Sequence, residues 1–332
     1  SIDLLIVLNG FSIITIELKN AFSGQTVKNA MNQYRFDRDP REPLFLFNRG
    51  SLVHFSVDTD TVYMTTKVSG SKTLYLPFNK GNNNGAGNPD NPHGRKTDYL
   101  WTEILQKDSL LEIIGRFIHL ERDDKGKWST LIFPRYHQMD SVRKMVADAK
   151  VSGAGKNYLI QHSAGSGKSN SIAWLSYRLA SLHDDKDQRV FDSVIVVTDR
   201  KVLDNQLQDT IYQFEHKMGV VQKIDKNSKQ LAEALTSGTN IIITTLQKFP
   251  FVLEHIASLP ARKYAVIVDE AHSSQGGEAS KKMKEVLSAK TLEEAELEDR
   301  IGEDDAEDEI RKSMMARGRQ SNLSFFAFTA TP

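Results

Sequence analysis

Residues 162–169 read HSAGSGKS, and they lie between the apolar run NYLIQH and a helical pattern. The apolar residues that recur at helical spacing are Ile172, Leu175, Leu179 and Leu182. In such a strand-turn-helix unit, Gly165 and Gly167 let backbone N–H groups close around phosphate oxygens at the positive end of the helix dipole. Lys168 would reach the β and γ phosphates of a nucleotide, and the Ser169 hydroxyl would ligate Mg²⁺. The residues predicted to bind the nucleotide here are Ser163, Ala164, Gly165, Ser166, Gly167, Lys168 and Ser169.

The strict phosphate-loop pattern begins with glycine, where this chain has His162. A strand-to-helix turn with a fortuitous Gly-Lys-Ser is therefore an alternative for this stretch alone. A second element argues against that alternative, because VIVDEAH (266–272) ends another apolar run about a hundred residues later. Asp269 at a strand terminus can hold Mg²⁺ through water, and Glu270 can orient and deprotonate an attacking water. An isolated Asp-Glu pair is often only a helix cap, but the two elements in this order predict an ATPase.

The apolar runs around these two elements predict a parallel sheet. They are continuous and rich in β-branched residues, which suits strands covered by helices on both faces. The predicted strands are NYLIQH (157–162), DSVIVVT (192–198), NIIITT (240–245), YAVIVDE (264–270) and SFFAFT (324–329).

Several segments resemble the motifs of superfamily 2 helicases and translocases. DEAH (269–272) and TATP (329–332) resemble motifs II and III, and PRYHQ (134–138) resembles the glutamine motif. TDRKVLDNQ (198–206) and TTLQKF (244–249) fall where that superfamily has its strand-tracking motifs. The resemblance implies a first RecA-like domain in which Gln138 reads adenine and His272 belongs to the nucleotide site. A second RecA-like domain with its arginine finger would follow motif III, so we expect this chain to bind ATP and barely hydrolyse it.

A second candidate site lies near the N-terminus, in IITIELKN (13–20). The apolar runs on both sides of Asn9-Gly10 predict a β-hairpin. Residues two apart in a strand share a face, so Glu17 and Lys19 point one way. The other face, expected in the core, carries Ile14, Ile16 and Leu18.

The register of this hairpin decides whether Asp3 joins Glu17. A plain two-residue turn pairs Leu8 with Phe11 and Asp3 with Ile16, which turns Asp3 away. A three-residue loop or a one-residue bulge would bring Asp3 to the face of Glu17. We expect the odd register, in which Asp3 and Glu17 can bind Mg²⁺ and Lys19 can activate water for attack on a phosphodiester.

The spacing Asp-(13 residues)-Glu-x-Lys resembles the PD-(D/E)xK nucleases, although Ile2 stands where many members have proline. Gln33 is similar to the glutamine of the Q-x3-Y motif in one nuclease subgroup, whereas Asp37 occupies the tyrosine position. The resemblance implies that Asp3, Glu17, Lys19 and Gln33 are catalytic.

A nuclease of this kind followed by a superfamily 2 motor resembles the restriction (R, motor) subunit of type I restriction-modification enzymes. The stretches with the wording of that family are ELKN (17–20), NAMNQYR (29–35), PFNKG (77–81), PRYHQ, SAGSGKS and VDEAHSSQ. The resemblance implies ATP and Mg²⁺ as cofactors, double-stranded DNA as substrate, and methylation and specificity subunits as partners. ATP-dependent translocation would then lead to endonucleolytic cleavage.

Composition is compatible with this hypothesis but does not prove it. The 332 residues include 43 Lys+Arg and 43 Asp+Glu, so a polyanion would be held by local patches rather than by net charge. The absence of cysteine excludes disulfides and thiolate chemistry and suits the cytoplasm. No apolar run reaches the roughly 18 to 20 residues of a membrane span.

The predicted fold class is α/β, with a mixed α/β restriction-endonuclease-like domain followed by a RecA-like parallel-sheet P-loop ATPase domain. The predicted borders are 1–122 for the nuclease domain, 123–130 for a linker and 131–332 for the RecA-like domain. Apolar runs at both ends predict a piece of a longer protein. Residues 79–94 predict a long exposed loop, and the acidic segment 291–309 predicts a solvated helix or loop.

Two other functions are open at this point. A stand-alone helicase with an N-terminal nucleic-acid-binding domain would be favoured if Asp3 faced away from Glu17. A nucleotide-gated scaffold would bind ATP without its assembly degrading DNA.

Overall fold

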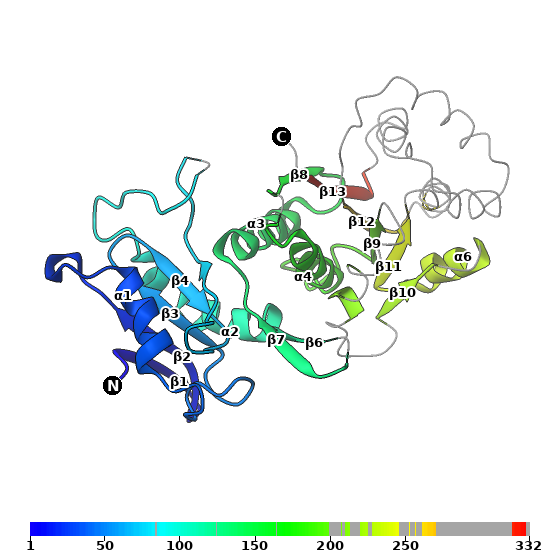
Figure 1. The fold of residues 1–332 in the computed structure, drawn as a ribbon. Helices are drawn as coiled ribbons and strands as arrows, with labels where there is room; N and C mark the ends of the chain where they lie inside the picture. Colours follow the sequence, from blue (N-terminus) through cyan, green and yellow to red (C-terminus); the bar gives the residue numbers. More distant parts are fainter. Residues whose placement is uncertain are drawn as a thin grey trace, which may run out of the picture. The chain divides into compact units, whose positions relative to one another are not determined.

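The computed structural model describes most of the N-terminal two thirds of the chain and, beyond that, mainly the strands of the second sheet. The described ranges are 1–83, 85–123, 125–163, 165–198, 210–212, 220–224, 228–245, 261–269 and 321–329, with positions 207, 252 and 256. The chain forms two compact units, Ser1–Asp140 and Ser141–Pro332. Figure 1 shows their elements.

The first unit is built on a five-stranded sheet in the order β1-β2-β3-β4-β5. These strands are β1 (Leu4–Leu8), β2 (Phe11–Leu18), β3 (Val53–Val57), β4 (Val62–Thr65) and β5 (Leu76–Pro77). Only β2 and β3 are parallel to each other, and the other neighbours are antiparallel. A parallel pair needs a crossover, which here includes helix α1 (Val27–Asn32) packed on the sheet. The sheet confirms the predicted mixed α/β class.

Helix α1 begins with a capping box. Thr26 is the N-cap residue, and the Asn29 side chain accepts a hydrogen bond from the Thr26 N–H at 2.9 Å. The chain continues directly into a π-helix, η2 (Gln33–Asp37), which buries Tyr34. Its wider turn displaces the side chains that follow relative to an α-helix.

The β1–β2 hairpin contains both a tight turn and a bulge. Leu8 faces Phe11 across Asn9 and Gly10, whose φ values are 50° and 85°. The register then shifts between Ile6 and Val7, so that Leu4 faces Ile16. The bulge produces the predicted odd register.

Three predictions about the first unit are wrong. Residues 44–48 read LFLFN, an apolar run that predicts a strand, but they form turns because Phe45 packs with Tyr34 in a small core cluster. Leu18 is 37% exposed, while Glu17 is fully buried, because β2 is covered on the face expected to be open. The predicted linker 123–130 instead falls in an antiparallel hairpin of β6 (His119–Arg122) and β7 (Trp128–Ile132).

The sequence from about Asp98 to Leu120 has a helical pattern and predicts one helix, but the structure divides it. A π-helix, η3 (Leu100–Ile104), precedes α2 (Lys107–Arg116). The first unit ends at Asp140, which lies inside α3 (Tyr136–Ser152), and not at the predicted linker.

The loop at 79–94 has a clamped base. Asn88 is buried and donates to the Asn79 Oδ1 atom and to the Asp60 carbonyl, each at 2.9 Å. Asn79 Oδ1 also accepts from the Val62 N–H at 2.8 Å, and Asn88 Oδ1 accepts from the Lys80 N–H at 2.8 Å. The two asparagines therefore tie the loop to the start of β4.

The second unit contains a six-stranded parallel sheet in the order β10-β11-β9-β12-β13-β8. Its strands are β8 (Tyr158–Gln161), β9 (Ser193–Thr198), β10 (Val221–Lys223), β11 (Ile241–Thr245), β12 (Tyr264–Val268) and β13 (Leu323–Thr329). The five strands predicted from continuous apolar runs are present, and β10 was not predicted. Helices α4 (Lys168–Ala180) and α6 (Ser228–Ser237) belong to the same unit.

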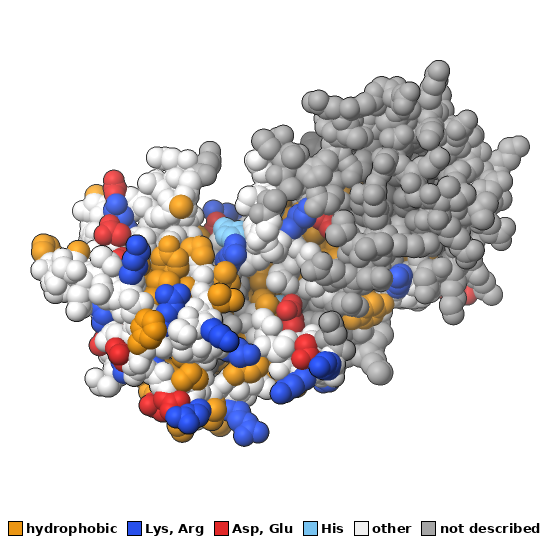
Figure 2. Space-filling view, viewed as in Figure 1, with side chains coloured by type: hydrophobic (Ala, Val, Ile, Leu, Met, Phe, Trp, Pro, Cys, Tyr) orange, Lys and Arg blue, Asp and Glu red, His pale blue; other side chains and the backbone are white. Residues whose placement is uncertain are grey.

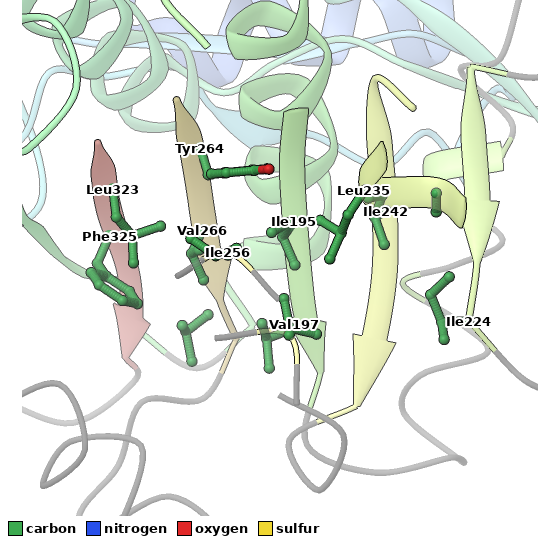
Figure 3. Packing of buried hydrophobic residues seen from close by; sticks show 13 residues of the cluster. Ile195, Val197, Ile224, Leu235, Ile242, Ile256, Tyr264, Val266, Leu323 and Phe325 are labelled. Atoms are coloured by element: carbon green, nitrogen blue, oxygen red, sulfur yellow. The ribbon is translucent and has the colours of Figure 1, made fainter. Parts of the chain in front are cut away.

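The core of this sheet is aliphatic and aromatic. Figure 3 shows side chains of β9, β11, β12 and β13 meeting on one face, among them Ile195, Ile242, Val266 and Phe325. Burial on both faces explains why these strands read as continuous apolar runs. The architecture is the predicted RecA-like parallel sheet.

The described surface is of mixed character. In Figure 2, Lys and Arg side chains of the first unit are interspersed with hydrophobic and acidic ones on the visible face. Within the described ranges, no helix combines the length and apolarity that a membrane crossing requires.

Candidate functional sites

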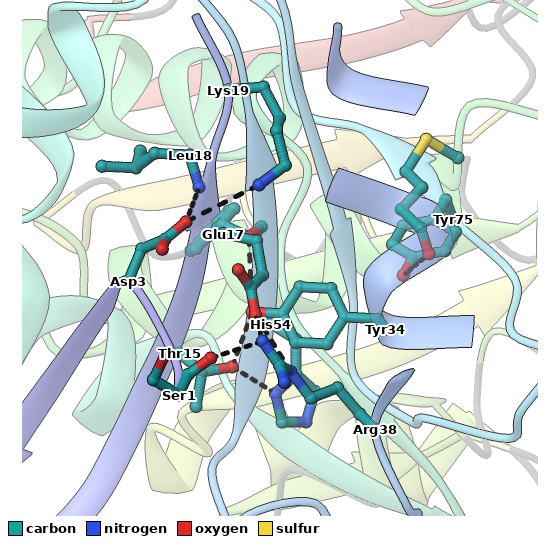
Figure 4. A network of polar contacts seen from close by, with 12 residues as sticks. Ser1, Asp3, Thr15, Glu17, Leu18, Lys19, Tyr34, Arg38, His54 and Tyr75 are labelled. Atoms are coloured by element: carbon teal, nitrogen blue, oxygen red, sulfur yellow. Dashed lines mark hydrogen bonds and ion pairs between the residues drawn. The ribbon is translucent and has the colours of Figure 1, made fainter. Parts of the chain in front are cut away.

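The first candidate site is a pair of carboxylates on neighbouring strands. Because the bulge puts Leu4 opposite Ile16, Asp3 comes opposite Glu17. Asp3 Oδ2 accepts a hydrogen bond from the Leu18 N–H at 2.8 Å and lies 3.9 Å from Lys19 Nζ. The structure therefore gathers Asp3, Glu17 and Lys19 at one end of the hairpin (Figure 4).

Glu17 is buried and only partly neutralised. Its Oε1 atom accepts from Arg38 Nε at 3.0 Å and also from Arg38 Nη2. Its Oε2 atom is buried and has no hydrogen-bond partner within the described residues. Burial raises the pKa of Glu17 above its usual value, Arg38 opposes that rise, and the nearby Asp3 adds to it.

Arg38 was not predicted from the sequence. It follows η2 directly, and its Nη2 atom also donates to the Ser1 carbonyl oxygen at 2.5 Å. Its contact with Glu17 depends on the π-helical turn, which pattern reasoning does not detect.

Gln33, the other predicted catalytic residue, is the first residue of η2. Its Oε1 atom is buried without a hydrogen-bond partner among the described residues. No hydrogen bond in the described part of the chain joins Gln33 to Asp3, Glu17 or Lys19. Its catalytic role stays a prediction.

The donor set suits a divalent cation of the oxygen-preferring kind. Asp3 and Glu17 face each other, and the buried Glu17 Oε2 is an unused acceptor. Within the described residues, no group of three or more His, Cys, Asp or Glu side chains forms a complete metal cage. Water would supply the remaining ligands, as Mg²⁺ commonly retains several waters.

A neutral polar network lies beside the carboxylates. Thr15 Oγ1 lies 2.8 Å from the Tyr34 hydroxyl and 2.7 Å from His54 Nδ1 (Figure 4). Burial lowers the pKa of His54 to about 4 and raises that of Tyr34 well above its usual value. The network is therefore uncharged at neutral pH, and its members fix one another by hydrogen bonds.

The second candidate site lies at the carboxyl edge of the parallel sheet. His162, at the departure from the strict loop pattern, is buried, and its N–H donates to the Thr329 carbonyl at 2.7 Å. Its Nδ1 atom lies 2.8 Å from Ser166 Oγ. The buried imidazole therefore stabilises the loop through its contact with Ser166, which explains why histidine can replace glycine there.

The loop has the backbone shape that its glycines predict. Gly165 and Gly167 have φ values of 72° and 81°, and Gly167 is the N-cap residue of α4. Ser163 is exposed, its carbonyl accepts the Ser166 N–H at 3.1 Å, and Ser169 lies in the first turn of α4. Ala164 lies outside the described residues.

Lys168 and Asp269 meet across the sheet edge. Lys168 Nζ lies 3.2 Å from Asp269 Oδ1, although β8 and β12 are separated by β13. Asp269 is held by its own N–H, which donates to the Val197 carbonyl at 3.0 Å. A lysine at the loop and a carboxylate at a strand end are the two charges that a Mg²⁺-nucleotide site needs.

Of the remaining predicted nucleotide residues, the structure describes only Gln138. Gln138 lies in the first turn of α3, and its Oε1 accepts the Arg135 N–H at 2.9 Å, which is a capping contact. Glu270, His272 and most of the strand-tracking segments lie outside the described residues. The acidic segment 291–309 also lies outside them.

Two sequence families match this chain. The family described as "Type I restriction enzyme R protein N terminus" matches residues 1–73. The family described as "SWI2/SNF2 ATPase" matches residues 137–292. The first match contains the carboxylate pair, and the second contains the phosphate loop and Asp269.

Curated relatives point in the same direction. The type I restriction enzyme HindI endonuclease subunit of Haemophilus influenzae is 26% identical over 291 residues, which are 83% of this chain and 26% of that protein. The putative type I restriction enzyme MjaIXP endonuclease subunit of Methanocaldococcus jannaschii is 24% identical over 99% of this chain and 29% of its own length. The chain thus spans between a quarter and a third of these relatives.

Solved structures resemble the chain only distantly. A fragment of a putative HsdR subunit of a type I restriction enzyme from Vibrio vulnificus has 15% identity and a TM-score of 0.32, covering 97% of this chain and 43% of that one. The UvsW helicase of bacteriophage T4 has 13% identity and a TM-score of 0.37, covering 69% and 61%. The two family matches and the curated relatives agree: the chain is similar to a part of the restriction (R) subunits of type I restriction-modification enzymes.

Proposed function

We propose that this chain carries the Mg²⁺-dependent nuclease site and the first half of the ATP-driven motor of a type I restriction enzyme. The observation that carries the nuclease half is the bulge, which places Asp3 opposite Glu17 with Lys19 beside them. The family matches support combining that site with an ATPase in one chain.

In the nuclease site, Asp3 and Glu17 would hold the cation, and Lys19 would orient the attacking water. Mg²⁺ held there would supply positive charge next to the phosphodiester and would lower the pKa of a bound water. Glu17 would need to be ionised to serve as a ligand, and the Arg38 guanidinium favours that ionised form.

In the nucleotide site, Lys168 would bind the β and γ phosphates while Ser169 and Asp269 hold Mg²⁺. Glu270 would orient the hydrolytic water, and Gln138 and His272 would complete the nucleotide contacts. The Lys168–Asp269 ion pair brings together the two charged groups that this role requires. We further propose double-stranded DNA as substrate, methylation and specificity subunits as partners, and the cytoplasm as location.

A stand-alone helicase with an N-terminal nucleic-acid-binding domain is the second candidate. It leaves the pairing of Asp3 with Glu17 without a purpose and does not account for the match to the R protein N terminus. We therefore favour the restriction subunit.

The test separates the two chemistries in the full-length protein, reconstituted with its methylation and specificity subunits on unmethylated DNA. Glu17→Ala should stop cutting while ATP hydrolysis continues. Lys168→Ala should abolish hydrolysis and, with it, the translocation that precedes cutting. Glu42→Ala and Lys186→Ala, at exposed positions, are the matched controls. If Glu17→Ala halted ATP hydrolysis to the same degree as Lys168→Ala, the proposal would be wrong.

A further inference from the structure

A cavity of about 330 Å³ opens beside Lys19, at the carboxyl ends of the parallel strands β2 and β3. Its volume lies at the lower end of the roughly 300–1,000 Å³ that ligand pockets occupy. The cavity adjoins the candidate nuclease site, because two of its lining residues also contact Asp3. The Leu18 N–H donates to Asp3, and the Lys19 ammonium pairs with it.

The lining of this cavity combines two kinds of side chain. Its apolar members include Leu4, Leu18 and the half-buried Trp101. Its cationic members are Lys19 and Arg95.

Of these two cations, Arg95 is the one whose charge is available to a ligand, because Lys19 pairs with Asp3. The Arg95 guanidinium has no ion pair or hydrogen bond within the described part of the chain, and Arg95 is exposed. Asp58 also lines the cavity, but its carboxylate already accepts the N–H groups of Val27 and Thr61 at 2.8 and 2.7 Å. Backbone dipoles thus stabilise the one acidic charge on the lining.

We propose that this cavity binds one unpaired nucleotide of a DNA strand, next to the phosphodiester that the carboxylate site would cut. Trp101 stacks on the base, and Arg95 pairs with the phosphate. An aromatic face beside an unpaired guanidinium is the combination that single-stranded nucleic acid selects. A paired base keeps both faces inside the duplex stack, so only an unstacked nucleotide can offer a face to Trp101. The inference rests on the proposed nuclease function for the identity of the neighbouring site.

The test measures binding of the twelve-residue oligonucleotide dT12 to the 332-residue chain in EDTA, so that no cutting occurs. Trp101 fluorescence is followed in a Trp128→Phe background, where Trp174 is buried and serves as an internal constant. We expect dT12 to quench the fluorescence of Trp101. Fluorescence anisotropy gives the Kd for dT12, and we expect Trp101→Ala or Arg95→Ala to raise this Kd roughly 5- to 150-fold. Trp101→Phe, which keeps an aromatic face, should restore most of the affinity, and Lys28→Ala on the exposed side of α1 should leave it unchanged.

Three results would overturn the assignment. In the first, both Trp101→Ala and Arg95→Ala bind dT12 as tightly as the unchanged chain does. In the second, these variants lose as much affinity for a blunt duplex as for dT12. In the third, free dTMP competes as effectively as dT12 does. The cavity proposal and the nuclease proposal can fail independently of each other. If pocket variants weaken dT12 binding but the full enzyme cuts DNA without Glu17, the cavity assignment stands and the nuclease assignment fails.

Discussion

Arg38 is the residue on which the charge of the carboxylate site depends. Glu17 is fully buried, and Arg38 supplies its hydrogen bonds from a side chain that is itself only 14% exposed. Removing one member of a buried ion pair costs about 3–5 kcal/mol, because the other charge stays buried without compensation.

We therefore predict that Arg38→Met lowers the free energy of unfolding of the first unit by about 3 kcal/mol or more at neutral pH. Arg38→Met with Glu17→Gln should recover most of that loss, since the buried charge is then gone. A double-mutant cycle, measured by hydrogen exchange of β2 peptides in urea, gives the coupling energy. Additive effects of the two substitutions would contradict the assigned pairing.

Because of the buried His54, we predict that the free energy of unfolding of the first unit depends on pH. Its pKa is about 4 in the folded chain against a usual 6.5. Between these values the unfolded chain binds a proton that the folded chain does not, so stability falls as the pH drops from 6.5 to 4. The full effect is on the order of 3 kcal/mol. Replacing His54 by Gln should flatten this slope in urea unfolding followed by exchange of β3 peptides, while His93→Gln, at an exposed position, should not.

At the scale of elements, the hairpin bulge sets the face of Asp3. Val7 faces Ser12 and Ile6 faces Ile14, so Ile13 is the extra residue. The tip beyond it is open to solvent, with Phe11 74% and Val7 51% exposed. The tip can therefore rearrange at little cost in packing.

Two single-residue deletions test this geometry. Deleting Ile13 removes the bulge but keeps Asp3 opposite Glu17, so Mn²⁺ binding by calorimetry and cutting by the full enzyme should both persist. Deleting Leu4 moves Asp3 opposite Ile16, on the other face of the strand, and should abolish both. Retained metal binding after the Leu4 deletion would show that the register does not make the site.

Sequence patterns predicted the elements that are determined by residues close together in the chain. The five long strands of the second sheet have continuous apolar runs, and Asn9-Gly10 has a turn preference of its own. The three-residue strand β10, with sequence VQK, is too short to show a period. Residues 44–48 have an apolar run that packs around Phe45 in turns, because tertiary contacts override propensity.

The candidate sites could be predicted only in part for the same reason. The residues Asp3, Glu17 and Lys19 follow from spacing, but the choice between two registers depends on a bulge that spacing leaves open. Arg38 and the His54 network meet Glu17 and Thr15 through contacts between distant segments. No periodicity in the chain encodes those contacts.

At the scale of the whole molecule, the proposed function requires coupling between two candidate sites that belong to different units. Lys168 is 149 residues beyond Lys19 in the sequence and lies in the other unit. The loop at 79–94 is a candidate for that communication, because long loops in compact chains are often functional. Its base is held by Asn79 and Asn88, while most of the loop between them is exposed.

We predict that replacing residues 82–87 by a short Gly-Ser bridge, with Asn79 and Asn88 retained, leaves ATP hydrolysis near normal but alters DNA cutting in the assembled enzyme. Asn88→Ala is the contrasting variant. It breaks the base of the loop and should lower stability by about 1–3 kcal/mol through unsatisfied buried groups. Unchanged cutting at matched ATP turnover would assign the loop no role in coupling.

The π-helix at Gln33–Asp37 makes the direction of the Arg38 side chain depend on the length of the preceding turn. A π-turn closes over one residue more than an α-turn, so gaining or losing a single residue converts one into the other. Such an indel rotates everything after it by about 100° around the helix axis. In a variant that lacks one residue within Gln33–Asp37, Arg38 would therefore point away from Glu17, and the buried carboxylate would need another neutralising partner.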